Sequence, residues 1–192
     1  MAIQKILLVG VGGQGTILAA KILSAGLLKA GYQVKMSEIH GMSQRGGSVS
    51  SHIVFSEEEV YAPSISKGEA DILVAFEEME ANRWIEYLKT GGKVVINDFQ
   101  IPSIPILVGA FEYPKGIKEG IRERVARSII FDARKIAAEA GNERAMNIVL
   151  LGALVKAMNL THVDWEKMIR SHVKEAFWDV NLKAFQKGME MV

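Results

Sequence analysis

The chain has 192 residues, 49% of them hydrophobic and 23% charged, which is enough to bury the core of one domain. Lys and Arg number 23 against 22 Asp and Glu, so the formal net charge of +1 excludes the strong positive field that attracts nucleic acid or anionic membranes. The absence of cysteine excludes disulfides, cysteine nucleophiles and thiolate-bound iron–sulfur or zinc centres built by this chain alone.

The N-terminal half predicts strands and a helix around two glycine-rich loops. The apolar run at residues 3–9 does not alternate with polar residues, which predicts a strand buried on both faces. A helix is expected over residues 14–30, and strands are expected over 33–38 and 48–55. A loop at 41–47 separates these two strands.

The remaining chain predicts alternating strands and helices, followed by helices alone. Strands are expected at 71–76, 93–97, 106–108 and 127–132, and helices at 77–89, 133–140, 143–158, 163–173 and 177–189. The helix at 77–89 is expected to end at the glycines of residues 90–92. The pattern predicts the α/β class: one domain over residues 1–192 with a Rossmann-like layered fold, a mostly parallel sheet and a helical C-terminal region.

The first glycine-rich loop matches the pattern G-x-G-x-x-G, between a predicted strand and a predicted helix. Glycine lets the backbone approach an anion closely, and the N–H groups and dipole of the helix start then face that anion. The sequence therefore indicates a phosphate site, with an empty tight turn as the alternative; we expect the Gln14 amide to donate to a phosphate oxygen or a water. The phosphate or cofactor candidates are Gly10, Gly12, Gly13, Gln14, Gly15 and Glu38.

Glu38 keeps a dinucleotide interpretation open. It lies 23 residues after Gly15, near the end of the second predicted strand, where a carboxylate binds a ribose hydroxyl in dinucleotide enzymes. A stand-alone NAD(P)- or flavin-dependent oxidoreductase is therefore one hypothesis, and a nucleotide-sensing regulatory module is another.

The second loop has no place in a plain dinucleotide fold. Its arginine, beside glycines, can reach an anionic ligand or a partner's carboxylate in bidentate geometry, or else brace its own loop. The ligand or partner contacts expected here are His40, Gly41, Met42, Ser43, Gln44, Arg45, Gly46 and Gly47. The four histidines of the chain lack the spacing of metal ligands, so we expect no metal site.

Asn147 interrupts an otherwise apolar helical run. We favour a buried amide satisfied by the backbone, and a bond across a subunit interface is the alternative. The sequence offers no nucleophile beside a base, no G-x-S-x-G elbow and no lysine after the glycine loop as in a P-loop. We therefore assign no catalytic residue and expect a scaffold with a binding loop.

Together these motifs resemble a known family. The first loop at residues 10–15, Glu38 and the second loop at 40–47 are similar to the gamma-type subunits of 2-oxoacid:ferredoxin oxidoreductases, and most of all to the small (beta) subunits of indolepyruvate ferredoxin oxidoreductases. The resemblance continues through 68–71, 75–77, 141–142, 147–153 and 181–185, and covers nearly the whole chain.

The resemblance implies a domain like the pyruvate/ketoisovalerate oxidoreductase gamma (catalytic) domain, in an enzyme that is inactive without its partner. Such enzymes decarboxylate a 2-oxoacid on thiamine diphosphate, transfer the acyl group to coenzyme A and pass electrons through iron–sulfur clusters to ferredoxin. The thiamine diphosphate and the clusters are expected in a larger partner subunit. A role for the loops of this chain in holding coenzyme A is a further expectation, and neither nucleic acid nor membrane is an expected partner. The longest apolar stretch, residues 148–155, is much shorter than the roughly 20 residues that span a bilayer, so we expect a cytoplasmic protein.

Overall fold

The computed structural model describes residues 3–40 and 46–192, which are built around one six-stranded sheet of order β2-β3-β1-β4-β5-β6. β1 pairs in parallel with β4, β4 with β5, and β5 with β6, whereas β3 is antiparallel to both β1 and β2. The strands are β1 Gln4–Val11, β2 Gln33–His40, β3 Ser48–Ser56, β4 Ala70–Ala75, β5 Leu88–Asn97 and β6 Ser128–Phe131. This sheet confirms the predicted α/β fold.

The one reversed strand follows from the length of its connection. Parallel neighbours need a crossover of about a dozen residues or more, usually with a helix. Only residues 41–47 separate β2 from β3, so the two strands pair as an antiparallel hairpin in which Glu38 lies opposite Ser51.

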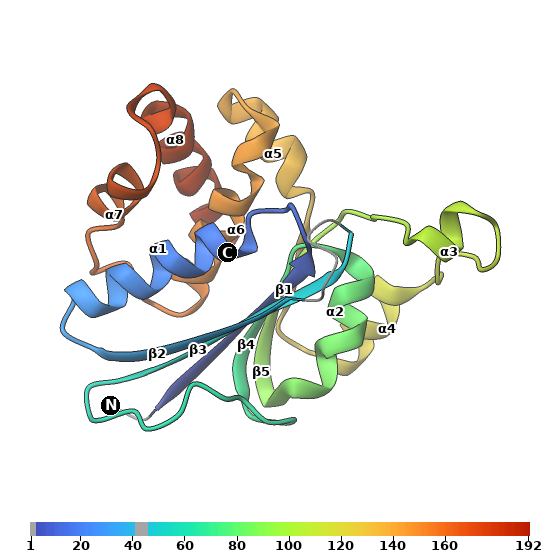
Figure 1. Cartoon of the computed structure of the whole chain (residues 1–192), viewed down its shortest axis with the longest axis horizontal. Helices are drawn as coiled ribbons and strands as arrows, with labels where there is room; N and C mark the ends of the chain where they lie inside the picture. Colours follow the sequence, from blue (N-terminus) through green and yellow to red (C-terminus); the bar gives the residue numbers. More distant parts are fainter. Residues whose placement is uncertain (1–2, 41–45) are drawn as a thin grey trace.

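Helices cover both faces of the sheet (Figure 1). One face packs against α1, α5, α6, α7 and α8, and the other against α2 and α4. The α-helices are α1 Thr16–Lys29, α2 Glu78–Trp84, α3 Ile104–Leu107, α4 Ile117–Arg124, α5 Ala133–Ala140, α6 Met146–Ala157, α7 Trp165–His172 and α8 Trp178–Met189. Three 3-10 turns complete them: η1 Ile85–Tyr87, η2 Glu143–Ala145 and η3 Glu175–Phe177.

β1 lies in the middle of these two layers. Ile6 and Leu8 belong to the core under α1 and α6, while Leu7 and Val9 belong to the core under α2 and α4. All four side chains are at most 1% exposed, which confirms the strand predicted to be buried on both faces.

The region between β4 and β6 departs from the sequence prediction. The helix expected over residues 77–89 ends at Trp84, and the chain passes through η1 into β5 at Leu88. Residues 90–92 therefore lie inside β5 and do not end a helix. The strand expected at 106–108 is also wrong, because α3 forms there with a proline in its first turn. The sequence prediction missed α4.

α6 and α8 approach so closely that glycine is required on both helices. A Cβ on Gly152 would lie 2.1 Å from the Phe185 carbonyl oxygen, and one on Gly188 would lie 1.9 Å from the Val149 carbonyl oxygen. No side chain fits in either place. This contact joins the two longest C-terminal helices into one unit over the sheet.

Candidate functional site

The glycine loop connects the carboxyl end of β1 to α1, and Gln14 braces it from within. Its side chain is 7% exposed. Oε1 accepts a hydrogen bond from the Val11 backbone N–H at 2.8 Å, and Nε2 donates to the Phe76 carbonyl oxygen at 2.7 Å. The amide that was expected to donate to a ligand thus ties the turn to the end of β4.

Gly15 closes the loop and caps α1. Its backbone has a φ of 80°, in the left-handed region that favours glycine. A Cβ there would also lie 2.7 Å from Asn147 Nδ2, the group that donates to the Gly15 carbonyl oxygen at 3.3 Å. Asn147 is 5% exposed, so the structure supports the favoured interpretation, an amide bonded to the backbone of its own chain. The bond joins the start of α6 to the start of α1.

A third amide fixes the C-terminal helices to the same place. Asn97, at the end of β5, is fully buried. Its Nδ2 donates to the Phe76 carbonyl oxygen at 3.1 Å, and its Oδ1 accepts from the Ala133 N–H at 2.8 Å, where α5 begins. Phe76 O therefore accepts from both Gln14 and Asn97.

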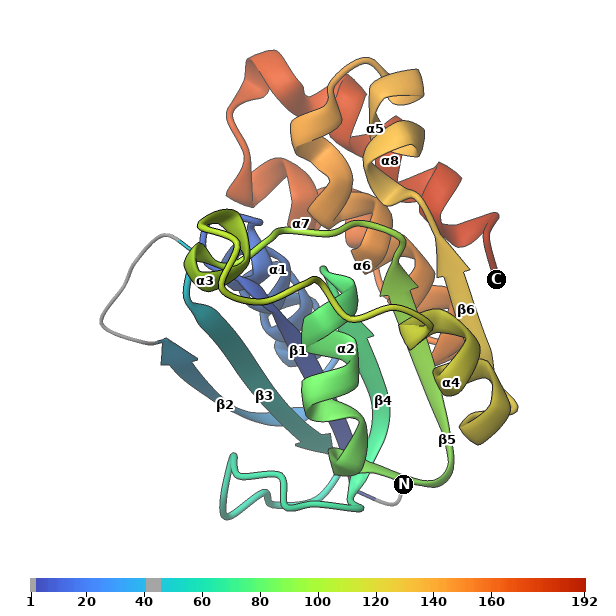
Figure 2. The same ribbon diagram turned by 90° about the vertical axis from the view of Figure 1, so that its right-hand side faces the viewer.

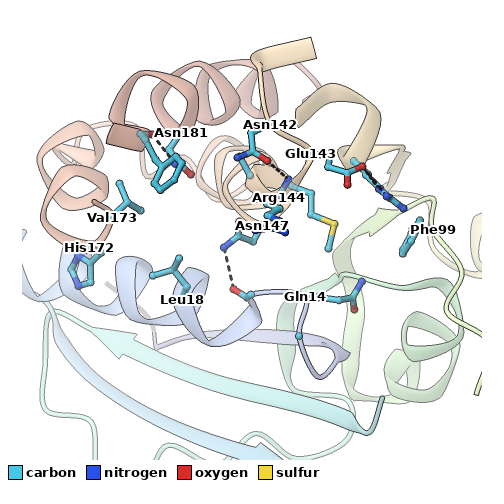
Figure 3. A pocket seen from close by; sticks show the side chains of 16 residues that line it. Gln14, Leu18, Phe99, Asn142, Glu143, Arg144, Asn147, His172, Val173 and Asn181 are labelled. Atoms are coloured by element: carbon cyan, nitrogen blue, oxygen red, sulfur yellow. Dashed lines mark hydrogen bonds and ion pairs between the residues drawn. The ribbon is translucent and has the colours of Figure 1, made fainter. Parts of the chain in front are cut away.

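A cavity of about 780 Å³ opens between the glycine loop and the C-terminal helices (Figure 3). Its walls come from the start of α1, the segment leading into α6, and the turn between α7 and α8. The lining residues are Gly13, Gln14, Gly15, Leu18, Phe99, Arg134, Asn142, Glu143, Arg144, Ala145, Met146, Asn147, His172, Val173, Phe177 and Asn181.

The cavity presents positive charge and helix N-termini on one side. The first turns of α1 and of the η2–α6 segment both border it, and the leading N–H groups of a helix have no acceptor within that helix. Arg134 forms an ion pair with Glu143 at 2.7 Å. In the described part of the chain no carboxylate pairs with Arg144, whose backbone N–H donates to the capping Asn142 side chain at 3.0 Å.

Part of the cavity wall is apolar, since Leu18, Val173 and Phe177 line it. In Figure 3 Leu18 and Val173 face the space between α1 and the C-terminal helices, and Arg144 and Asn147 come from the start of η2–α6. A ligand that carries both an anionic group and an apolar portion matches this lining.

The structure brings only part of the predicted site together. Gly13, Gln14, Gly15 and Asn147 line the cavity, whereas Gly10, Gly12 and Glu38 are not among its lining residues. Gly10 lies inside β1, where a Cβ would be 2.9 Å from both Gln14 Oε1 and Phe76 Cβ. Its role is close packing.

Glu38 lies away from the cavity, on the sheet face that α1 covers. It alternates along β2 with Val34 and Met36, which pack against the core under α1. Its Oε1 is buried and has no hydrogen-bond partner among residues 3–40 and 46–192. The dinucleotide hypothesis therefore lacks its ribose-binding carboxylate at this cavity.

The second loop is described only at its ends. Gly41, Met42, Ser43, Gln44 and Arg45 lie outside the described residues, as does the side chain of His40. At the other end, the Gly12 N–H donates to the Gly47 carbonyl oxygen at 2.9 Å. The two predicted loops are thus adjacent.

Sequence reasoning missed Arg134, Asn142, Arg144 and His172, which the fold brings to the cavity from the C-terminal half. Asn142 gave the only local signal, because an asparagine before a helical run is a typical N-cap. Within residues 3–40 and 46–192, no three His, Asp or Glu side chains gather as metal ligands. None of the helices described has the length and apolar character needed to cross a bilayer.

Comparison with known proteins gives one consistent result. Residues 5–191 match the family described as pyruvate ferredoxin/flavodoxin oxidoreductase. Indolepyruvate oxidoreductase subunit IorB from Pyrococcus horikoshii is 42% identical, over 96% of this chain and 94% of the relative. The subunit of the same name from Thermococcus kodakarensis is 40% identical, again over 96% of this chain and 94% of the relative.

Solved structures share the fold. The gamma subunit of a keto/oxoacid ferredoxin oxidoreductase from Geobacter sulfurreducens is 27% identical with a TM-score of 0.71, covering 98% of this chain and 97% of that one. A 2-oxoglutarate:ferredoxin oxidoreductase from Magnetococcus marinus, solved with 2-oxoglutarate, coenzyme A and succinyl-CoA bound, is 22% identical with a TM-score of 0.73. The match covers 98% of this chain but 31% of that chain, so the same fold is there part of a longer polypeptide.

Proposed function

Because the chain belongs to the pyruvate ferredoxin/flavodoxin oxidoreductase family, we propose that it is the small subunit of a 2-oxoacid:ferredoxin oxidoreductase that acts on indolepyruvate or a related arylpyruvate. The observation that carries this proposal is the similarity to IorB subunits along nearly the full length of both chains. A cytoplasmic location of the complex is part of the proposal.

The proposal assigns the reacting centre to a larger subunit. Thiamine diphosphate supplies the decarboxylation, and iron–sulfur clusters carry the electrons to ferredoxin. This chain has no cysteine to hold such a cluster, and among the described residues that line the cavity there is no serine, threonine or lysine to act as a nucleophile. Its own contribution is to bind and orient.

We assign the cavity beside the glycine loop to the coenzyme A that accepts the acyl group. The Arg144 guanidinium and the N–H groups at the starts of α1 and η2–α6 fit the phosphates of coenzyme A. The apolar wall at Leu18 and Phe177 fits the less polar remainder of the molecule. Held this way, the thiol end is free to reach an active site in the larger subunit.

The function is tested by reconstitution. The chain and the larger subunit of its complex are purified separately, and reduction of ferredoxin is measured with indolepyruvate and coenzyme A. We expect turnover only when both subunits are present. Turnover by this chain alone, or a reconstituted complex that prefers 2-oxoglutarate to indolepyruvate, would contradict the proposal.

The coenzyme A site is tested by Arg144→Ala in the assembled enzyme. Loss of one charge-assisted contact at an exposed position is expected to raise the KM for coenzyme A about ten-fold, equivalent to about 1.4 kcal/mol. The KM for indolepyruvate and kcat are expected to stay unchanged. Arg124→Ala is the matched control, because Arg124 is an exposed arginine on α4, on the other face of the sheet. A KM for coenzyme A equal in the two variants would refute the assignment.

A further inference from the structure

An extended arm connects β5 to α4 and projects beyond both helical layers. It comprises residues 99–113 and includes α3. Figure 1 shows α3 at the far right of the molecule, clear of the sheet, and in Figure 2 the same segment is nearest the viewer. Nothing in the cavity assigned to coenzyme A uses the outer part of this arm.

The base of the arm is fastened to the start of α2 by a buried carboxylate. Glu77 is 1% exposed, and its Oε1 accepts hydrogen bonds from the Ile101 backbone N–H at 3.1 Å and from the Tyr113 hydroxyl. The Tyr113 oxygen in turn accepts from the Met79 N–H at 3.0 Å. One acid therefore holds both ends of the arm together.

A second buried acid strengthens the same base. Glu78 accepts from Gln100 Nε2 at 3.0 Å and lies 3.6 Å from Lys118 Nζ, which also pairs with Asp98 at 2.6 Å. Burial raises the pKa of Glu78, while the hydrogen bond from Lys118 lowers the pKa of Asp98. Because these contacts hold the chain at both ends of the arm, the arm keeps one orientation.

The tip of the arm is compact and apolar. The Ala110 and Phe111 N–H groups both donate to the Pro105 carbonyl oxygen, at 2.9 and 3.3 Å, and so fold the tip onto itself. Its large apolar side chains are nevertheless 70–75% exposed. They form what we call the knob: Ile104, Leu107, Val108 and Phe111. Residues 99–111 contain no charged side chain, in a chain that is 23% charged.

We propose that the knob inserts into an uncharged apolar socket on the larger subunit of the oxidoreductase. Clustered apolar side chains on a surface mark sites of protein contact, and a preformed tip loses little conformational entropy when it docks. This inference rests on the proposed function for the existence of that larger subunit. The buried acids at the base set the direction in which the knob points.

Charge and area argue for the larger subunit over a second copy of this chain. Two cavities of this chain are bordered by charged side chains, including Arg144 in one and Lys156 and Glu166 in the other, which do not match an uncharged knob. Four side chains meeting four in a symmetric contact bury on the order of 500 Å² on each side, below the roughly 800 Å² per partner of a stable interface. The longer fold neighbour also joins this fold to additional polypeptide in one chain.

The test measures the affinity of the full chain for the separately purified larger subunit of its own complex. Leu107→Glu places a charge at the centre of the knob and is expected to weaken binding at least about ten-fold. Leu28→Glu is the matched control: Leu28 is 57% exposed on α1, and we expect its variant to bind within about two-fold of wild type. Leu107→Met, which keeps an apolar side chain, is expected to bind as wild type does.

The outcomes separate this inference from the proposed function. Both Leu→Glu variants are expected to keep the thermal midpoint of the free chain, because both side chains are exposed. If Leu107→Glu binds like wild type in an active complex, the knob assignment is wrong and the proposed function stands. If wild type does not bind the larger subunit, both fail. A dimer of the free chain that Leu107→Glu converts to monomer assigns the knob to a second copy and overturns the inference.

Discussion

Replacing Gly15 with alanine tests how the glycine turn is held. At a φ of 80° an L-residue costs about 1–2 kcal/mol relative to glycine. The new Cβ would also lie 2.7 Å from Asn147 Nδ2, so that amide must move and its hydrogen bond to the Gly15 carbonyl is lost. A hydrogen bond of this kind contributes about 0.5–1.5 kcal/mol. We therefore expect Gly15→Ala to lower the free energy of unfolding by about 2–3 kcal/mol in urea denaturation.

Gly13→Ala provides the matched comparison. Gly13 has a φ of 102°, and a Cβ there would meet no atom within 4 Å, so only the backbone cost of about 1–2 kcal/mol applies. In an Asn147→Ala background the amide is absent and only the Cβ at position 147, 3.2 Å from the new Cβ, remains in contact, so Gly15→Ala is expected to cost little more than the backbone amount. The reasoning is refuted if Gly15→Ala costs the same in both backgrounds, or no more than Gly13→Ala does.

Four further substitutions test other parts of the fold. Gly188→Ala inserts a Cβ 1.9 Å from a carbonyl oxygen of α6 and is expected to destabilise the chain by about 3 kcal/mol. Gly120→Ala, with space around the new Cβ, is expected to stabilise the chain by about 0.4–1 kcal/mol. The thermal midpoints of the two variants, measured by calorimetry, test both expectations. Gln14→Leu leaves the buried Val11 N–H without its acceptor and is expected to cost about 1–3 kcal/mol in urea denaturation. Burial lowers the pKa of His52 below 6.5, so the unfolded chain takes up a proton before the folded chain does as the pH falls, and the free energy of unfolding declines below pH 6.5. His52→Asn is expected to flatten this decline in denaturation profiles between about pH 5 and 7. An unchanged slope would contradict this expectation.

The strand, glycine loop and helix at the N-terminus were predictable because their signals are local. An unbroken apolar run, a glycine pattern and a second apolar run follow one another within residues 3–30. Such runs specify β1 and α1 mainly through local sequence preferences. The structure places both elements within two residues of the expected bounds.

The cavity was less predictable because its walls are distant in sequence. Asn147 reaches Gly15 across 132 positions, and Arg144 reaches the cavity only because α6 packs on the same face of the sheet as α1. Nothing near Arg144 distinguishes it from other exposed arginines. Gln14 was predicted to belong to the site, but its amide bonds inward, since Val11 and Phe76 offer it buried partners.

The errors around residues 77–92 arise from a conflict between local and long-range preferences. Acids in a first turn and paired glycines downstream favour one long helix. The structure instead pairs Leu88 with Ala70 and accommodates Gly91, at a φ of 75°, in an irregular stretch of the ladder. Pairing with β4 therefore outweighs the local signal.

The double acceptance at the Phe76 carbonyl has a consequence for how the cavity can vary. Gln14 ties the glycine turn to this oxygen, and Asn97 links the same oxygen to the start of α5. The Phe76 carbonyl oxygen therefore fixes the positions of the two walls relative to each other, and of its two donors only Gln14 lines the cavity. Substitutions among the other lining side chains can therefore leave the spacing between the walls unchanged.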